Sequence, residues 1–265
     1  MKKIAIVGLG NMGQALLRGL LDGNIVKKEE VFGVENDKLK AEFVKEIFKI
    51  NVSQKYNLLD KVDVIILAVK PQNMGEVIKG IKKYADKKLV ISIAAGISTR
   101  YIKNILQNSR IVRCMPNTPA LVLKGITGIY CDETVTNDDK RLVTEILGAI
   151  GEIMFFDEES YIDRITAISG SGPAYVFYFL EAIEEAAVLI GLSRTDARKL
   201  ARETFEGSIE LIKKTGKTPT ELKEMVTSPA GTTISALHVF EKEGVKGIIM
   251  DALMRAYNRS KELGS

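Results

Sequence analysis

A glycine-rich turn near the start of the chain constrains the fold more than any other feature. Residues 4–8, with the sequence Ile-Ala-Ile-Val-Gly, are typical of a short buried strand, and a helix with an apolar stripe follows the glycines at 8, 10 and 13. Strand, G-x-G-x-x-G turn and helix in this order are the context in which the motif binds a dinucleotide. Gly8 allows the tight turn, Gly10 lets a pyrophosphate approach the backbone, and Gly13 lets helix and strand pack closely. Unless the turn carries no ligand, the residues expected to contact the cofactor here are Gly8, Leu9, Gly10, Asn11, Met12 and Gly13.

Strand-like and helix-like segments alternate from residue 3 to about residue 156. This alternation predicts an α/β domain with a doubly wound parallel sheet, because parallel strands need helical crossovers. The expected strands are 4–8, 31–34, 62–69, 89–94, 110–115, 126–131 and 152–156. Ligands of such sheets bind at the carboxyl ends of the strands. The loops expected to share that edge are 8–13, 35–38, 69–72, 94–97 and 115–119.

From about residue 160 the strand pattern disappears and helical periodicity continues to the end of the chain. We therefore predict two domains, a Rossmann-type dinucleotide-binding domain at residues 1–159 and an all-α domain at residues 160–265. The helix expected at 173–190 is apolar on almost every side, which is typical of a helix buried all round. The helical domain is too small to bury it, so we expect a partner subunit. The alternative is a central helix wrapped by its own domain, and the last two residues, Gly264 and Ser265, are expected to be frayed.

Composition excludes several classes of function. The formal net charge is only +4 and the lysines are scattered, which argues against a nucleic-acid-binding protein. No apolar stretch is long enough to cross a membrane, and the glycines interrupt the first apolar run too early for a signal peptide. Cys114 and Cys131 lie in apolar runs without metal-ligand spacing, so we expect reduced thiols in a cytoplasmic protein that binds no metal.

The chain offers few of the usual catalytic side chains. Its one histidine, His238, falls mid-helix, where a packed structural residue is the expected role. The turn at 227–233 is a better candidate site, because Gly231 and small residues leave backbone N–H groups free to bind a carboxylate. Thr232 and Thr233 would add hydroxyl groups. The alternative is an ordinary helix cap formed by Ser228 and Thr232.

Six segments, taken together, resemble the pyrroline-5-carboxylate reductase family over almost the full chain. They are GLGNMG at 8–13, AVKPQ at 68–72, SIAAG at 92–96, MPNTPA at 115–120, SGSGPAY at 169–175 and SPAGTT at 228–233. The last is the most specific, and it contains one departure, because the family usually has glycine where this chain has Ala230. Alanine restricts positive φ, so substrate affinity could be altered if the turn needs that conformation.

The resemblance implies reduction of Δ1-pyrroline-5-carboxylate to L-proline, the last step of proline biosynthesis, by hydride transfer from NADH or NADPH. It assigns Thr233 a catalytic hydrogen bond to the ring nitrogen, and the substrate carboxylate to Ser228, Gly231 and Thr232. It also implies a homodimer interlocked through the helical domain, with rings of dimers in some members. The further cofactor contacts that it implies are Ala68, Val69, Lys70, Pro71, Ala95 and Asn117.

The choice between the two cofactors depends on Glu35, which lies 22 residues after Gly13. A carboxylate at this distance favours the ribose 2′-hydroxyl and repels a 2′-phosphate, so we predict a preference for NADH. Lys38 and Lys40 oppose this, since either could reach a phosphate. Alternatively, Glu35 merely begins the next helix.

Two rival functions remain open from the sequence. One is a Rossmann-type reductase of another cyclic imine or of a hydroxy acid, although residues 169–173 lack the lysine that the hydroxy-acid enzymes use. The other is a non-catalytic paralogue that binds dinucleotide. The turn at 228–233 argues against it, because such a protein does not need a site for a substrate carboxylate.

Overall fold

The computed structural model describes residues 2–263, so the expectation for Gly264 and Ser265 lies outside the described residues. The chain divides into two compact units, an α/β unit of residues 1–171 with 256–265 and a helical unit of residues 172–255.

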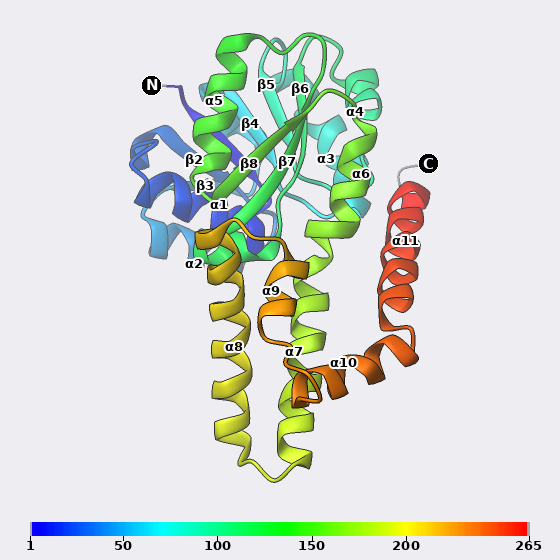
Figure 1. The fold of residues 1–265 in the computed structure, drawn as a ribbon. Helices are drawn as coiled ribbons and strands as arrows, with labels where there is room; N and C mark the ends of the chain where they lie inside the picture. Colours follow the sequence, from blue (N-terminus) through cyan, green and yellow to red (C-terminus); the bar gives the residue numbers. More distant parts are fainter. Residues whose placement is uncertain (1, 264–265) are drawn as a thin grey trace. The chain divides into compact units, whose positions relative to one another are not determined.

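Within residues 2–263, an eight-stranded sheet forms the centre of the α/β unit (Figure 1). Its spatial order is β3-β2-β1-β4-β5-β6-β7-β8, and the strands from β3 to β6 are all parallel. The doubly wound sheet predicted from the alternation is therefore present. The strands are β1 (Ile4–Val7), β2 (Val31–Val34), β3 (Asn51–Ser53), β4 (Val64–Leu67), β5 (Leu89–Ser92), β6 (Arg110–Met115), β7 (Gly125–Cys131) and β8 (Gly151–Phe156).

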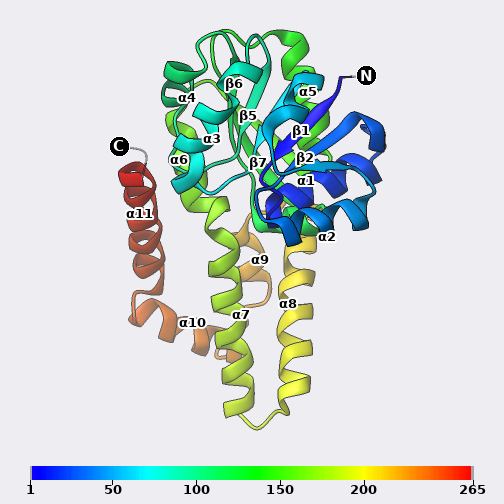
Figure 2. The ribbon, with the colours of Figure 1, turned by 180° about the vertical axis from the view of Figure 1, so that it is seen from behind.

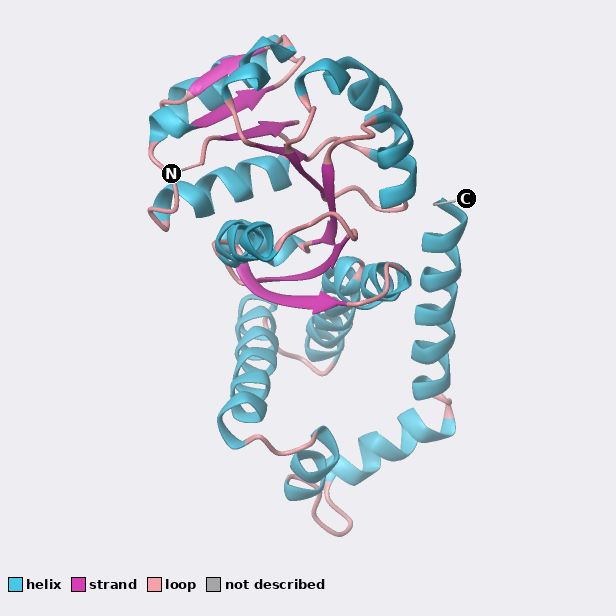
Figure 3. Ribbon diagram, turned by 90° about the horizontal axis from the view of Figure 1, so that it is seen from above, coloured by secondary structure: helices cyan, strands magenta, loops and turns pink. Residues whose placement is uncertain are grey.

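Helices cover both faces of this sheet (Figures 2 and 3). Alternate residues of β1 point to opposite faces: Ile4 and Ile6 pack with α1, α2 and α5, whereas Ala5 and Val7 pack with α3 and α4. The helices are α1 (Asn11–Asp22), α2 (Lys38–Phe48), α3 (Met74–Ile81), α4 (Thr99–Ile105), α5 (Asn137–Gly148) and α6 (Ser160–Ile165). Short 3₁₀ turns are η1 (Lys28–Glu30), η2 (Tyr56–Lys61), η3 (Pro71–Asn73), η4 (Lys82–Tyr84) and η5 (Thr118–Val122), and η6 (Thr166–Gly170) is a π-helical turn.

Strand β7 reverses the direction of the sheet. It pairs antiparallel with β6, and β8 then pairs parallel with β7. The connection between β6 and β7 holds only η5, which is too short for the helical crossover that a parallel partner needs. The five loops expected at one edge are unaffected, because β1, β2, β4, β5 and β6 all point the same way.

Asp139 fastens the start of α5 to β6 and gives a testable pH dependence. The buried carboxylate accepts hydrogen bonds from the Thr136 hydroxyl and from Arg110 Nε, each at 2.7 Å. Burial alone would raise the pKa of Asp139, but the hydrogen bonds from Thr136 and Arg110 outweigh burial and hold the pKa below its ordinary value. The ionised group therefore stabilises the fold above about pH 4, and this contribution is lost as the pH falls through the folded-state pKa.

Replacing Asp139 by asparagine is expected to lower the free energy of unfolding by about 2 kcal/mol at pH 7, because charge-assisted hydrogen bonds are lost. The difference in unfolding free energy between the wild type and the variant should be smaller at pH 3. Urea unfolding at one fixed protein concentration, run at pH 7 and at pH 3, measures this difference. An equal difference at the two pH values would contradict a stabilising role of the ionised Asp139.

The helical unit contains a hairpin of two long helices followed by shorter ones. Helices α7 (Gly172–Leu189) and α8 (Arg194–Thr215) lie side by side in Figures 1 and 2. Helices α9 (Pro219–Met225) and α10 (Thr232–Lys242) follow, and α11 (Val245–Leu263) continues into the residues counted with the α/β unit. No residue of α7 is buried in the single chain, and Phe177 and Tyr178 are 63% and 69% exposed. Such an apolar surface is typical of a helix that packs against a partner.

Across the described residues, no helix combines the length and the apolar run needed to cross a bilayer.

Candidate active site

The glycine turn after β1 has the geometry that the motif predicts. Gly8 has a φ of +94°, and a Cβ there would lie 2.7 Å from the carbonyl oxygen of Ala68. A Cβ on Gly13 would overlap the carbonyl oxygen of Gly8, so only glycine lets α1 pack this close to the turn. A Cβ on Gly10, in contrast, would meet no atom of residues 2–263 within 4 Å. Open space therefore faces Gly10, where a pyrophosphate would approach.

The start of α1 has free donors for that pyrophosphate. Gly10 is the N-cap residue and supplies no side-chain hydrogen bond, and the first turn of α1 has no acidic residue. The first backbone N–H groups of a helix have no partner within the helix, and the helix dipole favours an anion there. The residues present thus fit a dinucleotide phosphate group.

Glu35 joins the glycine turn to the end of β2. Its carboxylate is buried, with 6% of the residue exposed, and Oε2 accepts the backbone N–H of Leu9 at 3.0 Å. Oε1 accepts the N–H of Asp37 at 3.1 Å, and the Lys40 amine lies 3.5 Å from Oε2. The N-cap of α2 is Asp37, whose side chain accepts the N–H of Lys40, so Glu35 is not the residue that begins the helix.

The other expected cofactor residues follow parallel strands at the same edge. Ala68, Val69 and the Lys70-Pro71 pair come directly after β4, with Pro71 opening η3. Ala95 follows β5 and Asn117 follows β6. The Asn117 side chain is fixed in place, because its Oδ1 accepts the N–H of Ile126 at 3.0 Å.

The turn before α10 carries the expected substrate residues in the helical unit. Helix α10 begins at Thr232 with Gly231 as N-cap, and among the described residues no side chain caps it. The alternative of an ordinary cap by Ser228 or Thr232 is therefore not what the structure shows. The Gly231 N–H donates to the Ser228 carbonyl at 3.1 Å, and Ala230 has a φ of +56°. Ala230 thus adopts the left-handed conformation that glycine adopts more readily.

His238 is exposed on α10 of the single chain and lines a hollow with side chains of α9, such as Lys223 and Glu224. The packed position expected for it stays a prediction, because a partner subunit would cover surface that the single chain exposes.

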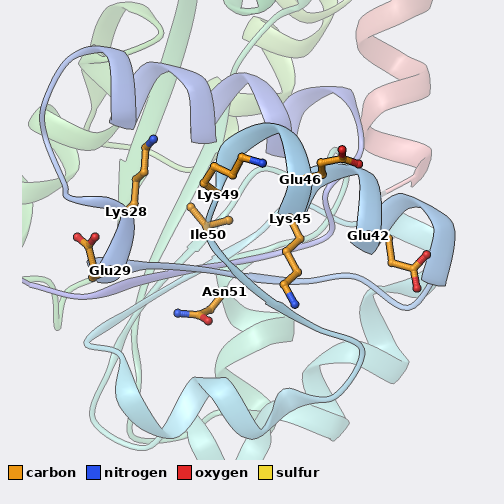
Figure 4. Close-up of a pocket in the computed structure, with 8 residues that line it drawn as sticks. All are labelled: Lys28, Glu29, Glu42, Lys45, Glu46, Lys49, Ile50 and Asn51. Atoms are coloured by element: carbon orange, nitrogen blue, oxygen red, sulfur yellow. The ribbon is translucent and has the colours of Figure 1, made fainter.

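A second hollow lies at the edge of the sheet where β2 and β3 begin (Figure 4). Its lining consists mostly of lysines and glutamates, and it comes from η1, the later part of α2 and the start of β3. The lining residues are Lys28, Glu29, Glu42, Lys45, Glu46, Lys49, Ile50 and Asn51. Because β2 and β3 begin here, the hollow is away from the carboxyl ends at which such sheets bind ligands.

A polar network that the sequence did not predict supports the cofactor edge. Arg113 of β6 is buried and donates to Asp163 at 2.7 Å and to Glu159 at 3.2 Å. Glu159 also accepts the N–H and the hydroxyl of Thr99, each at 2.7 Å, and Asp163 accepts the Ser260 hydroxyl at 3.2 Å. The network holds the start of α4, and with it the end of the 94–97 loop. The available signal was an arginine inside the apolar run of residues 110–115.

Comparison with known proteins relates both units to one family. The family model for pyrroline-5-carboxylate reductase dimerisation matches residues 159–263, and that for NADP oxidoreductase, coenzyme F420-dependent, matches residues 3–96. A pyrroline-5-carboxylate reductase of Methanosarcina acetivorans is 39% identical, covering 99% of this chain and 98% of the relative. The chain belongs to the pyrroline-5-carboxylate reductase family. The Escherichia coli member of this family is 37% identical, with 99% of this chain and 98% of the relative covered.

A solved structure of the family agrees in fold. The Plasmodium falciparum pyrroline carboxylate reductase, crystallised with NADP bound, has a TM-score of 0.91 and 36% sequence identity. The match covers 100% of this chain and 98% of that one. Membership of the pyrroline-5-carboxylate reductase family thus extends over both units, as the six sequence segments indicate.

Proposed function

We propose that this protein reduces Δ1-pyrroline-5-carboxylate to L-proline with NADH or NADPH. Full-length membership of the pyrroline-5-carboxylate reductase family is the observation that carries the proposal. The described residues support it with two complementary features: a glycine turn that fits a dinucleotide and an uncapped helix start that fits a carboxylate.

The chain's own residues bind and orient the reactants in this proposal. A nicotinamide bound at the glycine turn would supply the hydride for the imine carbon of the substrate, and the ring nitrogen would take a proton. The N–H groups at the start of α1 bind the pyrophosphate, and Glu35 accepts a ribose hydroxyl. Ser228, Gly231 and Thr232 hold the substrate carboxylate, and the Thr233 hydroxyl hydrogen-bonds the ring nitrogen. The remaining proposed cofactor contacts are Gly8, Leu9, Gly10, Asn11, Met12, Gly13, Ala68, Val69, Lys70, Pro71, Ala95 and Asn117.

The proposal also includes the arrangement of the chain. Residues 1–159 form the dinucleotide-binding domain, and residues 160–265 form the domain that dimerises and binds substrate, with rings of dimers as the larger assembly. The exposed apolar surface of α7 supports a helical interface. A cytoplasmic location is proposed because Cys114 and Cys131 are free thiols.

The deciding experiment follows the loss of nicotinamide absorbance with pyrroline-5-carboxylate, run in parallel with NADH and NADPH. Oxidation of either cofactor that depends on the substrate supports the proposal. Cofactor binding without oxidation would refute it and leave another cyclic imine or a non-catalytic paralogue.

A preference for NADH is proposed from the place of Glu35. Replacing Glu35 by glutamine removes the charge that repels a 2′-phosphate, and we expect the NADPH/NADH ratio of kcat/KM to rise about tenfold. Replacing it by serine should raise the ratio as well, but serine is too short to reach the Leu9 N–H, so both cofactors should bind more weakly. Initial rates with each cofactor give the ratio, and a ratio unchanged in Glu35→Gln would remove the basis for the preference.

A further inference from the structure

Lys40 stands beside the carboxylate at which a Rossmann-type fold distinguishes its two cofactors. A carboxylate at the end of the second strand accepts a ribose hydroxyl, whereas a nearby cation accommodates a 2′-phosphate. This chain supplies both groups within one ion pair, since the Lys40 amine lies 3.5 Å from Glu35 Oε2. We propose that Lys40 determines how well the protein accepts the 2′-phosphate of NADPH. The inference rests on the proposed function, because it needs the dinucleotide at this edge.

Glu35 cannot turn away to make room for a phosphate. Its two oxygens are held by the backbone N–H groups of Leu9 and Asp37, and the residue is buried. Leaving this position would break both hydrogen bonds and release the glycine turn. The negative charge beside a 2′-phosphate therefore has to be compensated where it lies, and Lys40 is the cation paired with it.

Lys40 has the freedom that Glu35 lacks. Its backbone is fixed because its N–H donates to Asp37 Oδ1 at 3.0 Å, but its side chain remains 41% exposed. The amine can therefore stay on Glu35 when NADH is bound and contact a phosphate when NADPH is bound. Glu35 and Asp37 would otherwise present two negative charges to the phosphate.

Lys38 is not equivalent to Lys40. Its amine lies 4.0 Å from the carboxylate of Glu42, further along α2, and its side chain is 74% exposed. An exposed pair of this kind holds a side chain only weakly, and the structure does not direct Lys38 toward Glu35. Lys45, near the opposite end of the same helix, lines the hollow of Figure 4 and serves as a matched control for net charge.

Calorimetric titration with adenosine 2′,5′-bisphosphate and with 5′-AMP tests the inference without any reaction. Lys40→Ala should weaken binding of the bisphosphate about tenfold and leave 5′-AMP within about twofold, because one exposed charge-assisted contact is lost. Lys45→Ala should leave the affinity for both ligands within about twofold of the wild type, and Lys40→Arg should retain the wild-type affinity for the bisphosphate. The NADPH/NADH ratio of kcat/KM should fall in Lys40→Ala, opposite to its rise in Glu35→Gln.

Three results would overturn the inference. The first is bisphosphate affinity unchanged in Lys40→Ala. The second is an equal loss for both ligands, which would mean that Lys40 only holds Glu35 and the glycine turn in place. The third is a wild-type protein that binds 5′-AMP but not the bisphosphate. If the wild type binds neither ligand, the dinucleotide site itself fails, and the proposed function fails with it.

Discussion

Replacing Arg113 by leucine is expected to lower the free energy of unfolding by about 3 kcal/mol. Leucine keeps an apolar side chain in β6 but removes the guanidinium group that donates to both Glu159 and Asp163. The two carboxylates, 23% and 19% exposed, then lose the cation that pairs with both of them. Removing one member of a buried charge cluster costs more than removing all of it, because the remaining charges lose the opposite charge that compensated them.

The triple variant Arg113→Leu, Glu159→Gln and Asp163→Asn separates this cause from lost packing. If uncompensated charge is responsible, the triple variant should regain most of the lost stability. Urea unfolding at fixed protein concentration measures this recovery. A triple variant no more stable than Arg113→Leu would assign the loss to packing in β6 instead.

The same substitution should weaken cofactor binding. Glu159 holds the Thr99 N–H and hydroxyl at the start of α4, directly after the loop that carries Ala95. Without Arg113, Glu159 loses the ion pair that positions it, and the loop loses its support. NADH titration by fluorescence should show a higher Kd for Arg113→Leu and a nearly normal Kd for Arg113→Lys, which keeps the charge.

The cofactor edge could be predicted from the sequence because its signals are local. Strand β4 reads as a continuous apolar run, and glycine has few substitutes where φ is positive or helix and strand nearly touch, as at Gly8 and Gly13. Once parallel topology follows from the alternation, the ends of the strands must lie at one edge. No residue-level contact is needed for that prediction.

The elements that escaped prediction lack such signals. Strand β3 is three residues long with two polar members, and it lies at the edge of the sheet, so it has neither an apolar run nor a clear alternation. The reversal at β7 follows from the short connection between β6 and β7, which is a matter of loop length and not of hydrophobic pattern. Arg113 finds its partners 46 and 50 residues further along the chain, a distance that periodicity cannot bridge.

The sequence predicts the position of Glu35 but not all of its contacts. Its spacing from Gly13 predicts a carboxylate at the end of β2, and the structure places it there. The spacing does not show that the carboxylate also holds the Leu9 N–H and the Lys40 amine. Glu35 therefore both supplies the negative charge and holds the glycine turn in place. For this reason glutamine and serine are expected to behave differently at this position.

Replacing Thr233 by valine is expected to lower kcat by about a hundredfold, because valine keeps the shape of threonine but cannot hydrogen-bond the ring nitrogen as it takes a proton. Folding should be unaffected, since α10 is capped by no side chain and so does not need this hydroxyl. Thr232→Val should instead raise KM for pyrroline-5-carboxylate, because its proposed contact is the carboxylate, which does not change during the reaction. Thr220→Val, the same change at an exposed site on α9, is the control and should alter neither constant. Steady-state kinetics at saturating cofactor separate the two constants. A Thr233→Val variant with normal kcat and raised KM would assign Thr233 to substrate binding and contradict a hydrogen bond that matters as the ring nitrogen takes a proton.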